Sequence, residues 1–220
     1  MFNNFDLNQL VVMIVPLLLA VTIHEVAHGY VAYRLGDPTA MLAGRLTLNP
    51  VKHLDFIGSF FLPLVLTFSG SPFIFGYAKP VPVNFANFRD FRKSTIYVSA
   101  AGVIANLALA IVSGAGYQIL LYFESIWYAS IFRPIMLDLL SMLGYSVIIN
   151  AVLAVFNLIP IPPLDGSRIL AMLLPVHLRV QFARIERFGM IIIIFLLITN
   201  SLSNLMSFFI NPLIKILLGK

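Results

Sequence analysis

The 220-residue sequence contains no cysteine, which excludes disulfides, thiolate metal ligands and thiol nucleophiles. Any metal ion that the chain binds must therefore be held by nitrogen and oxygen atoms. Charged residues are also scarce: they make up 10% of the chain, whereas about a quarter is usual in globular proteins. Hydrophobic residues make up 60%, and the mean hydropathy is +0.97. This composition is typical of an integral membrane protein.

The few charges have a clear bias. The formal net charge is +5, and most lysines and arginines fall in short loops, where they mark the cytoplasmic side of a membrane. The sequence has no basic run with interleaved aromatic residues, so a nucleic-acid partner is not expected.

Long apolar runs divide the chain. A helix needs about 20 residues to cross the roughly 30 Å hydrocarbon core of a bilayer. The first run is too long for the core of a signal peptide and lacks its flanking signals, so we expect it to be retained. The runs that are long enough are Leu7 to Tyr33, Thr95 to Phe123, Pro134 to Phe156 and Phe188 to about Leu218.

Two further runs are harder to assign. Phe56 to Phe75 contains Pro63, so it either spans the bilayer or enters and leaves on one side. Ile169 to Leu174 is too brief to cross. No repeat or linker divides the chain. We therefore predict one domain over residues 1–220, an all-α polytopic membrane protein with about four to six transmembrane helices and a re-entrant segment.

Two segments between the first long runs do not have a helical pattern. Gly44 to Asn49 alternates as a strand does. Gly76 to Asn84 has prolines at two alternate positions, and such prolines are tolerated only on an edge strand or in extended backbone. We predict a small membrane-associated β-sheet; the alternative is a pair of ordered loops. The open edge of the sheet would be formed by Ala78, Lys79, Pro80, Val81, Pro82, Val83 and Asn84.

The first apolar run contains the pattern His24-Glu25-Val-Ala-His28. Residues four apart share one face of a helix, so both imidazoles can reach one ion, with Glu25 beside them as a general base. If the helix ends near Gly36, the histidines lie about 18 and 12 Å below its end. Polar residues at such depth are usually functional. The alternative is that they pair with polar groups of neighbouring helices.

A catalytic zinc site needs a third protein ligand and an open position. Asp165 follows the proline-rich stretch Asn157 to Pro163, and non-helical backbone at membrane depth is tolerated where it lines a watery cavity. The alternative is that Asp165 caps the short helix that follows, a common role for aspartate and one compatible with metal binding. The rival ligand is His53, whose charged neighbours suit a membrane-surface histidine. Glu124 and Glu186 are the remaining glutamates for a site with a glutamate ligand, and neither lies in an obvious helix-facing pattern.

The combination of HEVAH, GYAKPVPVN, SAAGVIANLALA and NLIPIPPLDG resembles the site-2 protease family of intramembrane zinc metalloproteases. The likeness is to the small prokaryotic type without a PDZ or CBS domain, and it extends from about Pro16 to Arg168. It implies that His24, His28 and Asp165 bind one Zn²⁺ and that Glu25 is the base. It also associates Asn157 with contact to the substrate or its oxyanion. Gly102 and Asn106 match a GPxxN sequence of many members, although Val103 replaces the proline.

On this resemblance the chain hydrolyses peptide bonds in or near transmembrane segments, with zinc-bound water as the nucleophile. The expected partners are a transmembrane protein substrate and the lipid bilayer, and no oligomer is indicated. We expect a multi-pass protein of the cytoplasmic membrane with its active site nearer the cytoplasmic side. The alternative is a zinc-binding transporter or an inactive scaffold. Glu25 argues against that alternative, because metal binding alone needs no base.

Overall fold

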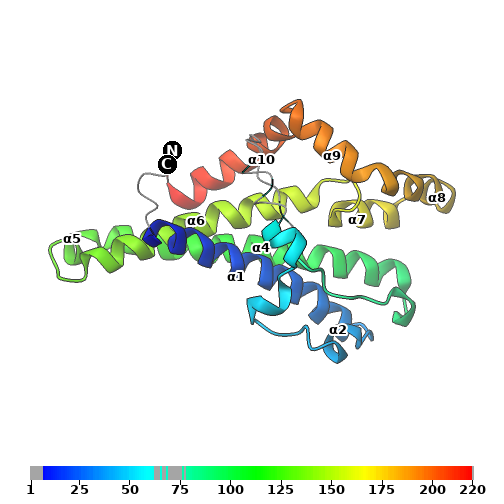
Figure 1. Ribbon diagram of the computed structural model, residues 1–220, viewed down its shortest axis with the longest axis horizontal. Helices are drawn as coiled ribbons and strands as arrows, with labels where there is room; N and C mark the ends of the chain where they lie inside the picture. The colour runs from blue at the N-terminus through cyan, green and yellow to red at the C-terminus, as the bar shows by residue number, and fades with distance from the viewer. Residues whose placement is uncertain (1–6, 62–64, 66–67, 69–75, 77, 220) are drawn as a thin grey trace.

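In the computed structural model of the protein, residues 7–61, 65, 68, 76 and 78–219 are described. Three long helices, α1 (Leu7–Arg34), α4 (Phe91–Tyr122) and α6 (Arg133–Leu158), lie side by side along the molecule (Figure 1). Together with α10 (Ser201–Leu218) they are the four described helices that are long and apolar enough to cross a membrane. The prediction of a multi-span helical protein is therefore confirmed.

Short helices connect these long ones. Helix α4 begins where the Asp90 side chain accepts a hydrogen bond from the Lys93 backbone N–H. Helix α6 ends at Leu158, just before the proline-rich segment. The short elements are α2 (Thr39–Leu42), η1 (Pro50–His53), η2 (Phe56–Phe61), η3 (Phe85–Asn87), α5 (Glu124–Trp127), α7 (Asp165–Leu173), α8 (Val176–Ile185), η4 (Glu186–Phe188) and α9 (Gly189–Ile198).

The last apolar run does not form the single long helix that hydropathy predicts. It is divided between α9 and α10, which meet at a sharp angle (Figure 1). Asn200 lies at the break and has a φ of 57°, a left-handed conformation that ends an α-helix. Only α10 is then long enough to count as a membrane span. Hydropathy does not detect the break because the residues on both sides of it are apolar.

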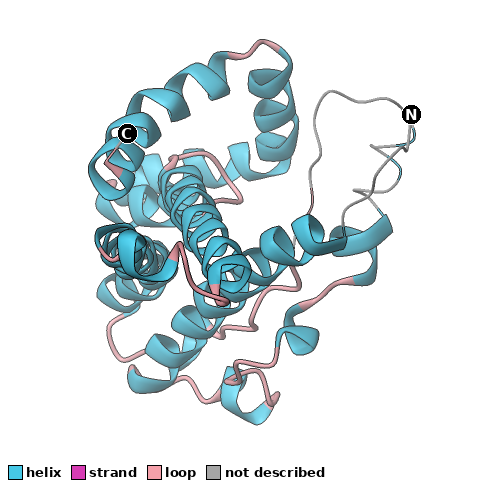
Figure 2. Cartoon of the chain, turned by 90° about the vertical axis from the view of Figure 1, so that its left-hand side faces the viewer, coloured by secondary structure: helices cyan, strands magenta, loops and turns pink. Residues whose placement is uncertain are grey.

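The predicted β-sheet is wrong for the residues described here, which contain no strand (Figure 2). The segment Ala78 to Asn84 is extended, but its backbone N–H groups donate to residues that are not in a strand. The Lys79 N–H donates to the His53 carbonyl at 2.9 Å, and the Asn84 N–H donates to Asp37 at 2.7 Å. Prolines 80 and 82 have no N–H to offer. Ordered loops, the alternative reading, describe this region.

The other predicted strand, Gly44 to Asn49, forms turns and bends that begin at Gly44, where φ is +63°. The Phe56 to Phe75 run starts as the π-helical turn η2. Most of the rest of that run lies outside the described residues, so its crossing or re-entry stays a prediction.

Candidate metal centre

The two histidines of the HEVAH pattern face each other across one turn of α1. Their ring centroids are 4.6 Å apart, and the two Nε2 atoms are 3.0 Å apart. Both side chains are buried. The helix continues without interruption through this region as far as Arg34, so the i, i+4 spacing is kept rigidly. Both imidazoles therefore present a nitrogen to the same small space.

Helix α4 fixes the orientation of both rings. His28 Nδ1 lies 2.6 Å from the Val98 carbonyl oxygen, and His24 Nδ1 lies 2.6 Å from Asn106 Oδ1. Oxygen atoms of this kind only accept, so each Nδ1 carries the hydrogen. In a neutral imidazole the Nε2 atom is then left with a lone pair. This is the tautomer that a metal ligand requires, held by a partner on the other nitrogen.

Asp165 completes the cluster from a different part of the chain. Its Oδ2 atom lies 3.3 Å from His24 Nε2 and 3.2 Å from His28 Nε2. The expectation that Asp165 caps α7 is wrong: the helix begins at Asp165 itself, and its N-cap residue is Leu164. A Cβ on the next residue, Gly166, would lie 2.1 Å from the Leu158 carbonyl oxygen. The glycine thus lets the start of α7 pack directly onto the end of α6.

These three residues fit a zinc ion. Two Nε2 lone pairs and a carboxylate oxygen converge with no hydrogen between them, an arrangement that repels itself unless a cation lies in the middle. Asp165 Oδ2 is buried and has no hydrogen-bond partner among the described residues. Zn²⁺ binds nitrogen and oxygen at about 2.0–2.2 Å in tetrahedral geometry, which places ligand atoms roughly 3.3 Å apart. The observed separations of 3.0, 3.2 and 3.3 Å match this requirement.

Glu25 lies next to the cluster but is not part of it. One of its carboxylate oxygens, Oε2, accepts a hydrogen bond of 2.8 Å from the Val81 backbone N–H. Val81 belongs to the extended segment that was predicted as an edge strand. Glu25 is therefore held beside the three convergent side chains, and not among them, by a segment distant in sequence.

A cavity of about 300 Å³ opens beside these side chains. It is lined from four directions: by α1, by the extended segment and η3, by α4, and by the α6–α7 connection. Asn157 lines it and donates its Nδ2–H to the Leu153 carbonyl at 3.0 Å. The lining residues include His24, Glu25, His28, Pro80, Val81, Val83, Phe85, Ser99, Asn157, Asp165 and Arg168. The three convergent side chains therefore border this cavity.

His53 lies elsewhere. Its side chain is only 1% exposed, and its Nε2 is 2.9 Å from the Thr47 carbonyl oxygen. The expectation of a membrane-surface histidine is therefore wrong. The ring is buried and bonded to the backbone of the preceding loop, although Lys52 and Asp55 flank it in sequence. Its own carbonyl bonds the Lys79 N–H, so it helps to anchor the extended segment. Glu124 and Glu186 lie in α5 and η4, and no cluster of metal-ligating groups found among the described residues includes them.

The sequence alone did not indicate all of the buried polar residues that hydrogen-bond behind the histidines. Asn106 was named only through a family resemblance, and Asn150 was not named at all. Both are fully buried and hydrogen-bonded to each other at 2.7 Å. The available signal was an asparagine inside an otherwise apolar run, since a polar residue at membrane depth usually has a specific partner.

Comparison with known proteins agrees with this geometry. Residues 12–200 match peptidase family M50, and the chain belongs to this family. It is 36% identical over 198 residues to "Putative zinc metalloprotease YwhC" of Bacillus subtilis (strain 168), covering 90% of this chain and 85% of that protein. It is 30% identical over 186 residues to "Putative zinc metalloprotease Rip2" of Mycolicibacterium smegmatis, covering 84% of this chain and 66% of that protein. No solved structure matches. The chain is thus a zinc metalloprotease.

Proposed function

We propose that this protein is an intramembrane metalloprotease that cleaves peptide bonds in or near the transmembrane segments of other membrane proteins. The observation that carries the proposal is the convergence of His24, His28 and Asp165, whose ligand atoms all lie within 4.8 Å of one another. Two of these residues are on α1, a helix long and apolar enough to span a membrane. The site is therefore built into the transmembrane part of the molecule.

The depth of the site supports a membrane-embedded substrate. His28 precedes the end of α1 by six residues and His24 by ten, which is about 9 and 15 Å at 1.5 Å per residue. A soluble substrate would not reach this depth, whereas a transmembrane segment is already there. The carboxyl end of α6 and the start of α7 form the opposite wall, so water and substrate have a common space beside the ligands.

We assign the chemistry to four residues. His24, His28 and Asp165 would hold the zinc ion, which would supply the Lewis acidity for activating a water molecule and polarising the scissile carbonyl. Glu25 accepts the proton of the attacking water and later delivers a proton to the leaving amine. Asn157 lies in the cavity wall, where its amide can donate to the oxygen that gains negative charge.

We further propose that the extended segment from Ala78 to Asn84 holds the unwound substrate. A transmembrane helix bonds its own carbonyls, so a stretch of it must unwind before cleavage. Extended backbone can bind such a stretch by β-augmentation. Pro80 and Pro82 have no N–H, and the Val81 N–H is taken by Glu25, so this segment offers chiefly carbonyl acceptors. Substrate N–H groups would supply the donors, which gives affinity with little demand on side-chain identity.

The test is a Glu25→Gln variant. The change removes the base but keeps every proposed zinc ligand, so cleavage should be abolished while zinc stays bound. Purified wild-type and variant proteins are compared for zinc content, and both are co-expressed with a panel of single-span membrane proteins to detect a cleaved band. His24→Ala is the matched control for a lost ligand.

Zinc loss in Glu25→Gln as severe as in His24→Ala would contradict the role assigned to Glu25. A wild-type protein that binds zinc but cleaves none of the panel at any level above the variant would favour a transporter or scaffold.

A further inference from the structure

A continuous line of buried polar side chains extends from the metal centre into the membrane-spanning helices. His24 Nδ1 meets Asn106 Oδ1 at 2.6 Å, and Asn106 Nδ2 donates to Asn150 Oδ1 at 2.7 Å. Asn150 Nδ2 donates in turn to the Ser146 carbonyl at 2.8 Å. The Ser146 hydroxyl lies 2.7 Å from that of Ser113. The line connects α1, α4 and α6, and each of these side chains is buried.

The order of donors and acceptors along this line is fixed by backbone carbonyls. The Ser146 carbonyl can only accept, so it determines that the amide nitrogen of Asn150 faces it and that Asn150 Oδ1 faces Asn106. The Ala20 carbonyl accepts from Asn106 Nδ2 at 3.1 Å. Both hydrogens of the Asn106 amide are thus used, and its oxygen is left to face His24. If this amide were reversed, its oxygen would face two other oxygens.

We propose that Asn150 is a positioning residue for zinc, acting through Asn106 on the tautomer of His24. A reversed Asn106 amide would present N–H to His24 Nδ1, and the imidazole hydrogen would move to Nε2. That tautomer has no lone pair at Nε2 and cannot bind the metal. Asn150 supplies one of the two acceptors that prevent the reversal. This inference rests on the proposed zinc site and extends it to a residue that has no contact with the ligand atoms.

The position of Asn150 in the fold makes a purely structural role a poor explanation. An asparagine within an apolar spanning helix is costly unless its amide is fully bonded, and Ser146 in the same helix already accepts both of its N–H groups. The Asn150 oxygen is what remains, and it points at Asn106. A leucine of similar shape would fill the same volume without the polar cost. The acceptor that it offers to Asn106 is therefore what asparagine supplies at this position and leucine does not.

The experiment compares zinc affinity in three purified variants by competition with a chelator, with thermal unfolding recorded for each. Asn150→Leu should weaken zinc binding about tenfold, the lower end of the effect of removing an outer-shell partner. Ser113→Ala is the matched control: it removes a buried hydrogen bond at the far end of the same line and should leave zinc affinity within twofold. Asn150→Asp should restore affinity close to wild type, because a carboxylic acid at this depth is neutral and keeps one acceptor and one donor.

The outcomes separate this inference from the proposed function. If the zinc affinity of Asn150→Leu is within twofold of the wild-type affinity, the inference is overturned and the proposed zinc site is unaffected. Equal loss of zinc in Ser113→Ala and Asn150→Leu would also overturn it, since the effect would then be general loss of packing. If Asn150→Leu does not fold, weak zinc binding by a folded Asn150→Asp would count against the inference. A variant that keeps its zinc after both His24 and Asp165 are replaced would contradict the proposed function instead.

Discussion

Gly102 is the point at which α4 comes closest to the two histidines of α1. A Cβ at this position would lie 2.5 Å from His24 Cε1 and 2.5 Å from His28 Nε2, distances that no packed side chain tolerates. Both rings are held on their other side by Asn106 and Val98, so they cannot move away without losing those bonds. A side chain here would therefore displace the two histidines proposed as zinc ligands.

We expect Gly102→Ala to lose zinc and activity although it adds a single methyl group. Overpacking of this kind costs about 1–3 kcal/mol, and here the displaced atoms are the proposed metal ligands. The matched control is Gly116→Ala on the same helix, where a Cβ would meet Leu143 Cδ1 at an ordinary 3.4 Å. Zinc content of the two purified variants is the measurement. A fully metallated Gly102→Ala would show that the site does not have the tight geometry described above.

Asp165 and His53 differ sharply in their distance from the two histidines of the cluster. Asp165 Oδ2 lies 3.2 Å from His28 Nε2, whereas His53 bonds the Thr47 carbonyl in a different loop. Asp165→Ala should therefore lose both metal and activity. His53→Ala should keep the metal, and its activity should fall because the loop whose His53 carbonyl bonds the Lys79 N–H loses its side-chain bond to the Thr47 carbonyl. Asp165→Asn keeps the shape but loses the charge, and its activity should fall at least tenfold.

The measurement is the zinc content and the cleavage rate of each purified variant. If Asp165→Ala binds zinc stoichiometrically while His53→Ala contains no zinc, the third ligand is His53 and not Asp165.

The residues of the site were predictable to different extents. The spacing of His24 and His28 follows from helix geometry alone, because residues four apart share a face. Asp165 did not follow from geometry, since nothing local in the sequence indicates that α7 begins directly at the metal centre. Asn150 was missed because its role depends on which helices become neighbours. The periodicity of a sequence predicts which residues share one face of a helix. Only the folded structure shows which helix packs against that face.

At the scale of elements, Asp37 anchors the extended segment to the end of α1. Its carboxylate accepts hydrogen bonds from the Asn84 N–H at 2.7 Å, the Asn87 amide at 2.7 Å and the Thr39 N–H at 3.1 Å. The side chain is fully buried. Burial raises the pKa of this carboxyl, but the hydrogen bonds from Thr39, Asn87 and Asn84 together lower it by more than burial raises it. The pKa of Asp37 therefore lies below the ordinary 3.8.

This pKa shift predicts how the anchor depends on pH. A carboxyl whose pKa is lower in the folded than in the unfolded protein stabilises the fold fully above the unfolded value, near pH 3.8, and this contribution is lost as pH falls through the folded value. Asp37→Asn should therefore reduce stability near pH 7 by about 1.5–3 kcal/mol, the range for hydrogen bonds to charged groups. The difference from wild type should shrink in acid.

Thermal unfolding of both proteins in detergent at pH 7 and at pH 3 checks this dependence. A difference that is equal at both pH values would show that the charge of Asp37 does not matter. A parallel assay of cleavage at pH 7 reports whether the extended segment needs its anchor for activity.

The elements also show where prediction from sequence works. Hydropathy located α1, α4 and α6 to within a few residues of their bounds, because a spanning helix must bury about 20 apolar residues. The sheet prediction failed because alternating and proline-containing segments fit both a strand and an extended loop. Which of the two forms is decided by the partners of Lys79, Val81 and Asn84. Those partners are His53, Glu25 and Asp37, and none of them is in a strand.

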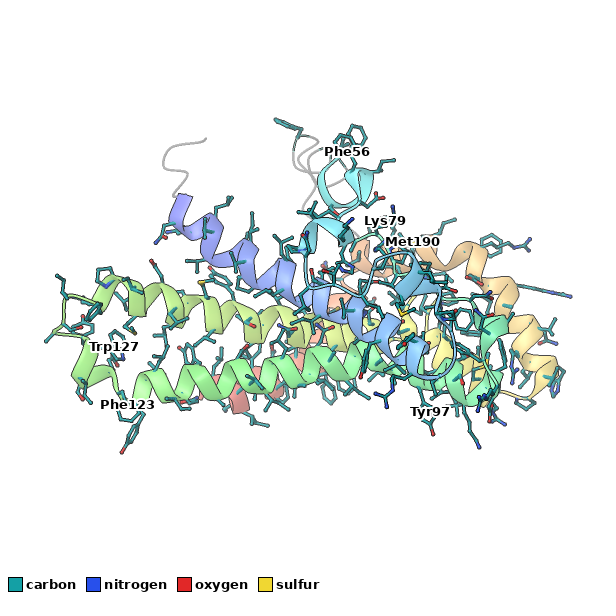
Figure 3. The ribbon with its side chains drawn as sticks, turned by 90° about the horizontal axis from the view of Figure 1, so that it is seen from below. Phe56, Lys79, Tyr97, Phe123, Trp127 and Met190 are labelled. Atoms are coloured by element: carbon teal, nitrogen blue, oxygen red, sulfur yellow. The ribbon has the colours of Figure 1, made fainter. Side chains whose placement is uncertain are left out.

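At the scale of the whole molecule, the two ends differ in composition. The turn between α4 and α6 carries aromatic side chains, and Phe123 and Trp127 lie together at that end (Figure 3). Lys79 and Tyr97 lie away from that end of the molecule. The chain from the last residue of α1 to the first turn of α4 carries Arg34, Arg45, Lys52, Lys79, Arg89, Arg92 and Lys93 against Asp37, Asp55 and Asp90. This end has the excess of positive charge that marks the cytoplasmic side.

We therefore expect the α1–α4 loops to be cytoplasmic, the amino terminus and the α4–α6 turn to be external, and the chain to cross the membrane four times in full. The absence of cysteine makes this directly testable, since any thiol introduced is the only one present. Ala86 in η3 and Ile131 in the α4–α6 turn are both exposed. A membrane-impermeant thiol reagent applied to intact cells should label Ile131→Cys and not Ala86→Cys, and permeabilised cells should label both. Retained protease activity in each variant shows that the fold is preserved. Labelling of Ala86→Cys alone in intact cells would invert the topology and place the metal centre nearer the outer face.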